Sequence, residues 1–173
     1  MTKSTLSLSC GLALLLSATA QADVEVKFSE GAPKDRFTIS NQGKCSLKNL
    51  MVDLDLSKSQ GKLIFDITGA GAGVEVFQPF EVTEGDIKLA SADGVKDGDS
   101  GMSLIIGSLN PGQRASFTID IDDTIPSGAR GMIIVAGSEI QGGTVSVKMG
   151  DMTPATAVFN NQSKATVPVS TCS

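Results

Sequence analysis

Hydrophobic and polar residues alternate with a period of two along most of this chain. Val24, Val26 and Phe28 alternate with two charged residues, and similar runs recur at residues 36–40, 50–56, 116–122 and 145–149. Such a run places apolar side chains on one face of a β-strand and polar ones on the other. The pattern is typical of a sheet that packs on one face and meets water on the other. It therefore predicts that Asp120 and Asp122 share a solvent-facing side.

Two runs are apolar on both faces, and these predict central strands: Leu63-Ile64-Phe65 and Met132-Ile133-Ile134-Val135. Glycine and proline separate the runs, and Asn110-Pro111-Gly112-Gln113 has the residues of a type II turn. About nine to eleven short strands are expected, which favours an all-β, antiparallel β-sandwich. The pattern leaves an immunoglobulin-like and a jelly-roll topology open.

The first 22 residues resemble an export signal. Lys3 is followed by an apolar stretch and then by small residues that end at Ala22. Cleavage after Ala22 is preferred, and cleavage after Ala20 is the alternative. The apolar stretch is too short to anchor the chain in a bilayer. We therefore expect a signal peptide at residues 1–22 and a single β-sandwich domain at residues 23–173.

Export changes the interpretation of the cysteines. Cys10 is lost with the signal, which leaves Cys45 and Cys172 in an oxidising compartment. An even number of thiols in an exported chain predicts one disulfide between them. The alternative is two separate buried thiols.

Composition and charge exclude several classes of function. The chain has no His, Trp or Tyr, so histidine-based catalytic triads and imidazole metal sites cannot be built. Aromatic platforms for sugars and single-stranded nucleic acid are also lacking, because Phe is a poor substitute. Loss of Lys3 leaves thirteen basic and nineteen acidic residues, a formal charge of −6. This charge disfavours nucleic acid and anionic membranes and favours cations, and no later segment predicts membrane insertion.

Acidic residues supply the candidate metal site. Asp120, Asp122 and Asp123 close a strand, and Asp97 and Asp99 lie in a glycine-rich loop. Calcium prefers carboxylate and carbonyl oxygens, so these five residues are the predicted calcium ligands. Glu30 and Asp35 flank a Gly-Ala-Pro turn and are weaker candidates. The alternative is a solvated acidic surface that keeps the protein soluble.

Several stretches resemble the bacterial "aggregation factor core" proteins, which are named for similarity to the core of the sponge aggregation factor. The matching stretches are residues 30–39, 63–66, 71–81, 97–99 and 117–124. The likeness as a whole extends over most of the exported chain, from about Val24 to the final strands. The resemblance implies extracellular cell adhesion with calcium and glycans, and it brings no catalytic residues.

The sequence therefore predicts an exported, non-enzymatic β-sandwich for cell adhesion or surface interaction, possessing no catalytic residues and assisted by calcium. Expected partners are a protein or glycan at the cell surface, or a second copy of the chain. The expected location is secreted, at the cell surface or periplasmic. Two alternatives are a carboxylate-based hydrolase acting on extracellular polysaccharide, which needs two carboxylates across a cleft, and a periplasmic structural subunit that lends strands to a partner.

Overall fold

The computed structural model describes residues 22–70, 72, 77–125 and 135–169. Within these residues it contains twelve strands and one short 3-10 helix. They are β1 (Ala22–Ser29), β2 (Asp35–Asn41), β3 (Leu47–Asp55), β4 (Ile64–Phe65), β5 (Glu81–Glu84), β6 (Ile87–Leu89), β7 (Gly101–Leu109), β8 (Arg114–Ile119), β9 (Ile121–Asp122), η1 (Gly137–Ile140), β10 (Thr144–Met149), β11 (Ala155–Val158) and β12 (Lys164–Val169).

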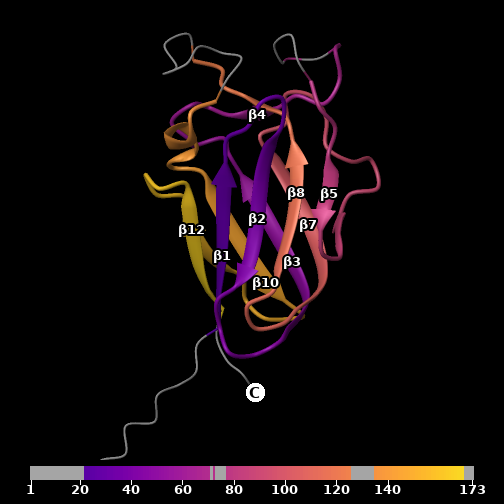
Figure 1. The fold of residues 1–173 in the computed structure, drawn as a ribbon, viewed down its shortest axis with the longest axis vertical. Helices are drawn as coiled ribbons and strands as arrows, with labels where there is room; N and C mark the ends of the chain where they lie inside the picture. Colours follow the sequence, from indigo (N-terminus) through magenta and orange to yellow (C-terminus); the bar gives the residue numbers. More distant parts are fainter. Residues whose placement is uncertain (1–21, 71, 73–76, 126–134, 170–173) are drawn as a thin grey trace, which may run out of the picture.

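Ten of the strands form two five-stranded antiparallel sheets that pack face to face as a β-sandwich. Sheet A has the order β12-β1-β2-β8-β5, and sheet B has the order β11-β10-β3-β7-β6. In Figure 1 the strands of sheet A lie side by side, and β3, β7 and β10 cross behind them. The remaining strands, β4 and β9, pair with each other at one end of the sandwich. The predicted all-β sandwich is confirmed.

Strand order favours the jelly-roll alternative. β5 and β8 are neighbours in sheet A, although the paired strands β6 and β7 of sheet B lie between them in the sequence. In an immunoglobulin sheet of order ABED, the fourth and fifth strands are consecutive and adjacent. The repeated crossing from one sheet to the other is the arrangement of a double-sheet jelly roll.

The alternating positions fill the space between the sheets. Phe37 on β2 is fully buried and stacks on Phe117 of β8 with ring centroids 5.1 Å apart. Phe28 lies 5.2 Å from Phe37, and Phe159, which follows β11 of the opposite sheet, meets it edge-on at 6.4 Å. Phe37 therefore joins three strands of sheet A to a residue from the opposite side of the core.

The structure corrects the prediction of central strands. Leu63-Ile64-Phe65 contributes only the two-residue β4, which pairs with β9 at the end of the sandwich instead of lying inside a main sheet. Leu63 and Phe65 are fully buried because they cap the end of the core. Of the run at residues 132–135, only Val135 is described, and it is buried outside any strand. Twelve strands also exceed the expected nine to eleven, since such short pairings leave no periodic signal.

Tight turns close the opposite end of the sandwich. Gly112 has a φ of 72°, and the Gln113 amide donates to the Asn110 carbonyl at 2.9 Å, as expected for this turn. Asn41 is fully buried beside it and donates from Nδ2 to the carbonyls of Cys45 and Leu109. These bonds hold the β2–β3 and β7–β8 connections together.

Several sequence predictions concern residues that the structure does not describe. Cys172 and residues 1–21 of the predicted signal peptide lie outside the described residues. Cys45 is not a free thiol, and its pairing with Cys172 stays a prediction. Within the described ranges, no helix is long and apolar enough to cross a membrane.

We expect the Phe37→Ala substitution to lower the free energy of unfolding by about 3–5 kcal/mol, because it leaves a cavity at the centre of the core. Urea denaturation measures the change. Val158→Ala is the control, since Val158 is 57% exposed and should change stability by less than about 0.5 kcal/mol. Equal effects of the two substitutions would show that the aromatic cluster does not hold the sheets together.

We also expect a disulfide between Cys45 and Cys172. β12 ends at Val169, which pairs with Ala22, and the neighbouring Asp23 carbonyl accepts the Gln42 amide at 2.8 Å. The end of β12, three residues before Cys172 in the sequence, therefore lies at the same end of the sandwich as the turn that contains Cys45. Intact mass should be two hydrogens below the reduced mass, and reduction should cost about 2–4 kcal/mol of stability. Alkylation of both thiols without reductant would contradict this pairing.

Candidate functional site: a buried carboxylate cluster

β4 pairs with β9 at one end of the sandwich, where Figure 1 labels β4. Four aspartates that interact through their charges gather at this end. We call Asp35, Asp66, Asp120 and Asp122 the carboxylate cluster. Asp35 begins β2, Asp66 follows β4, Asp120 lies between β8 and β9, and Asp122 ends β9. All four are buried, with 1–7% of each residue exposed.

Backbone hydrogen bonds place these aspartates. The Asp66 amide donates to the Asp120 carbonyl at 3.1 Å, and the Asp120 amide donates to the Gln78 carbonyl at 3.1 Å. The Gln78 amide donates in turn to the Asp66 carbonyl at 3.3 Å. Strand register adds two constraints, because Asp35 pairs with Ile119 and Asp122 pairs with Ile64. The cluster is thus fixed by main-chain contacts among segments far apart in the sequence.

The prediction that Asp120 and Asp122 face solvent is wrong. Asp120 is only 7% exposed and Asp122 only 1%. β8 lies between β2 and β5, and after Ile119 the chain pairs with β4 instead of continuing along sheet A. Alternation identifies the side on which a residue lies, whereas the neighbouring segments decide whether that side meets water.

Burial changes the acidity of Asp35. The pKa of its carboxyl group is raised from 3.8 to about 7, mainly by desolvation and to a smaller extent by the charges of Asp120 and Asp122. The Gly31 amide donates to Asp35 Oδ1 at 3.0 Å and opposes this shift. A carboxyl group with this pKa exchanges its proton near neutral pH.

Asp120 behaves in the same way. Its pKa is raised to about 7, first by desolvation and then by the charges of Asp122 and Asp66. Its Oδ2 atom is buried and has no hydrogen-bond partner. A buried, unsatisfied carboxylate oxygen is costly unless a proton or a cation neutralises it.

Asp123 belongs to a different group. It lies near Glu139 of η1, and burial together with the Glu139 charge raises the pKa of Asp123. Gly61 packs against both residues, since a Cβ there would lie 3.0 Å from Glu139 Cβ and 3.3 Å from Asp123 Cβ. The predicted trio therefore divides, with Asp120 and Asp122 in the carboxylate cluster and Asp123 beside Glu139.

The other two predicted ligands, Asp97 and Asp99, accept hydrogen bonds from amide groups of loops. Asp97 Oδ1 accepts the amides of Ile67 and Thr68 at 2.8 and 2.9 Å. The Thr68 hydroxyl also bonds to Asp97, and this contact lowers the Asp97 pKa. Asp99 Oδ2 accepts the Lys96 amide at 2.8 Å. These carboxylates satisfy loop amides, so they have an evident structural role.

Sequence reasoning did not select Asp66 and ranked Asp35 low. Each aspartate adjoins a strand with buried apolar residues: Asp66 follows Leu63-Ile64-Phe65, and Asp35 precedes the run that contains Phe37. An aspartate next to a buried strand is a usable signal for a strand-end cluster. Only the pairing of β4 with β9 shows that these two meet Asp120 and Asp122.

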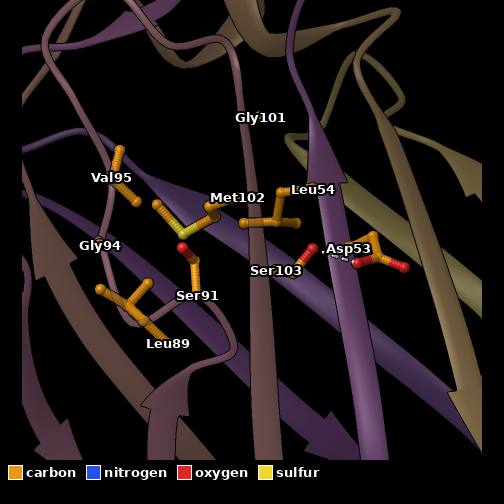
Figure 2. A pocket seen from close by; sticks show the side chains of 9 residues that line it. All are labelled: Asp53, Leu54, Leu89, Ser91, Gly94, Val95, Gly101, Met102 and Ser103. Carbon is orange, nitrogen blue, oxygen red and sulfur yellow. Dashed lines mark hydrogen bonds between the residues drawn. The ribbon is translucent and has the colours of Figure 1, made fainter.

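Two grooves lie elsewhere on the sandwich. The first, of about 430 Å³, lies between β3, β7 and residues 89–95, as Figure 2 shows. Its lining combines the hydrogen-bonded pair Asp53 and Ser103 with apolar Leu89 and Met102. The second, of about 380 Å³, lies on the outer face of sheet A and includes Glu25. Each groove has a single lining carboxylate, Asp53 or Glu25.

Comparison with known proteins adds little. No protein-family model and no curated protein matches the chain. Among solved structures, a family GH18 chitinase from Chromobacterium violaceum is similar at 18% identity with a TM-score of 0.38. The match covers 85% of this chain but only 20% of the chitinase chain. A likeness this weak supports no conclusion about fold or activity.

The pKa values predict that the protein loses stability as pH rises from about 4 to about 7 in the presence of a chelator. Asp35 and Asp120 have folded-state pKa values raised from 3.8 to about 7, so folding favours their protonated forms, and this contribution to stability is lost as pH rises between those two values. We expect the melting temperature to fall by several degrees, because each kcal/mol corresponds to about 2–4 °C for a domain of this size.

Asp120→Asn should weaken this pH dependence and raise the melting temperature at pH 8, because the amide removes one charge. Asp93→Asn is the matched control, since Asp93 is exposed in a loop and its substitution should leave the pH profile unchanged. A wild-type melting temperature that is constant or rises across this range would contradict the assigned acidities.

Proposed function

We propose that the protein is an exported, non-enzymatic binding module for cell adhesion or surface interaction, and that calcium binds at the carboxylate cluster. The observation that carries the calcium proposal is Asp120 Oδ2, a buried oxygen without a hydrogen-bond partner among other carboxylates. Calcium takes hard oxygen ligands in flexible geometry, and these aspartates supply them. A bound cation would also offset their mutual repulsion.

The proposed ligand set differs from the sequence-based set. It keeps Asp120 and Asp122 and adds Asp35 and Asp66. The charge of Asp120 raises the pKa of Asp35, and the charge of Asp66 raises the pKa of Asp120. Among the described residues, no group of three or more metal-ligating side chains is already gathered for a metal ion. We therefore propose a site that calcium completes by drawing the carboxylates together, with affinity in the weak range of extracellular modules.

The positions of the carboxylates support a binding role over hydrolysis. Carboxylate-based glycoside hydrolysis needs two carboxyl groups that flank the substrate. Asp35 and Asp120 have pKa values suited to a general acid, but each is less than a tenth exposed. Each of the two grooves presents one carboxylate. No described groove therefore combines substrate access with a carboxylate pair.

The adhesion part of the proposal comes from the resemblance to aggregation factor core proteins. That resemblance covers the stretches that contain all four aspartates of the cluster, at residues 30–39, 63–66 and 117–124. These stretches meet in three dimensions at the β4–β9 end. A calcium ion bound there would therefore stabilise the folded arrangement of these stretches at the β4–β9 end.

We expect millimolar calcium to raise the melting temperature at pH 8 by several degrees relative to a chelator, because it binds the folded state alone. Calcium should also weaken the pH dependence, since a cation favours the ionised carboxylates. Asp35→Asn combined with Asp120→Asn should abolish the shift. Asp99→Asn is the control and should keep it.

If calcium still raises the melting temperature of the double variant fully, the ion binds elsewhere. If the rise is lost in Asp99→Asn, the loop that contains Asp97 and Asp99 is the favoured calcium site. Light scattering in calcium and in chelator tests the adhesion part. A molar mass that is higher in calcium than in chelator supports self-association. An unchanged monomer in both conditions rejects the self-association version.

A further inference from the structure

The outer face of sheet A carries rows of polar side chains that run across four strands. Strand register gives one row of Lys164, Lys27, Thr38 and Ser116, from β12 to β8. The next row along the strands contains Thr166, Glu25, Ser40 and Arg114. The groove of about 380 Å³ lies over these rows, and its volume is within the range of small-ligand sites.

Two lysines lie directly opposite each other in this face. Lys27 of β1 pairs in register with Lys164 of β12, and like charges at such positions destabilise a sheet. Lys164 Nζ forms an ion pair with Glu25 Oε2 at 3.0 Å. The side chain of Lys27 is exposed, and within the described part of the chain its ammonium group forms no hydrogen bond or ion pair. One positive charge in the groove is therefore not neutralised by the protein.

The groove is basic although the protein is acidic. Lys27, Lys164 and Arg114 line it against one carboxylate, that of Glu25, while the exported chain as a whole is predicted to carry a charge of −6. Arg114 is 61% exposed, and its ion pair with Glu84 is long at 3.6 Å, so its guanidinium remains accessible. Ser40 and Thr38 add hydroxyl groups between the cations. The groove thus offers separated positive charges with hydrogen-bonding groups between them.

We propose that this groove binds an anionic polysaccharide, whose carboxylate or sulfate groups contact Lys27 and Arg114. Sugar hydroxyls would donate to Glu25, whereas the closely spaced phosphates of a nucleic acid would be repelled by it. An anion between Lys27 and Lys164 would remove the repulsion across the strand pair.

This proposal goes beyond the proposed calcium function and does not depend on it. The groove lies on the exposed outer face of sheet A, whereas the carboxylate cluster is buried at the β4–β9 end. Polysaccharide binding should therefore persist in chelator and in the Asp120→Asn variant.

Titration calorimetry with heparin, a polyuronate and neutral dextran, all in chelator, tests the proposal. We expect salt-sensitive binding of at least one polyanion and no binding of dextran. Heparin alone would assign sulfate recognition, and binding of both polyanions would assign general recognition of anionic sugars. Lys27→Ala combined with Arg114→Ala should weaken binding about tenfold or more, because charge-assisted hydrogen bonds are lost.

Lys48→Ala combined with Lys88→Ala is the matched control, since both lysines are exposed on sheet B and the charge change is equal. It should change affinity by less than about twofold. Lys27→Ala alone should leave the urea midpoint unchanged or raise it, which separates lost binding from lost folding. Equal weakening in the control, no binding of either polyanion by the folded wild type, or equally tight binding of double-stranded DNA would each overturn the proposal.

Discussion

The aromatic contact between Phe37 and Phe117 is the interaction on which the rest of the structure depends. Phe37 also meets Phe28 and Phe159, so one residue connects β1, β2 and β8 with a residue that follows β11. These rings are fully or almost fully buried, and burial of large apolar side chains is the main favourable contribution to folding. With the sheets held face to face, the loops at each end have defined positions.

The buried carboxylate cluster lowers the stability that the aromatic core provides. Burial of ionisable groups without full compensation is unfavourable, and such costs concentrate at functional sites. In this protein the unfavourable groups lie at the β4–β9 end, and the turns with Asn41 and Gly112 stabilise the opposite end. The two ends therefore differ in character, because one is held by satisfied hydrogen bonds and the other carries carboxyl groups that exchange protons near neutral pH. The paired Lys27 and Lys164 on sheet A are a second, smaller cost at a surface position.

Much of the fold could be predicted from local pattern, and the candidate site could be predicted only in part. The alternation around Val24, Phe37 and Val145 identified strands and their buried faces correctly. Leu63-Ile64-Phe65 was misassigned, because an apolar run that caps a core has the same composition as a central strand. Asp120 and Asp122 were selected as neighbours, but Asp66 was not, because it is distant in sequence and has no motif of its own.

By itself the sequence determined which side of each strand is apolar, and this is enough to require two sheets that face each other. Residue type and spacing are local properties, and they fix the alternation without reference to distant segments. Strand order was decided only by the tertiary structure, which places β8 between β2 and β5 and pairs β4 with β9. That order buries Asp35, Asp66, Asp120 and Asp122 together and sets Lys27 opposite Lys164, because burial and charge repulsion depend on which segments become neighbours.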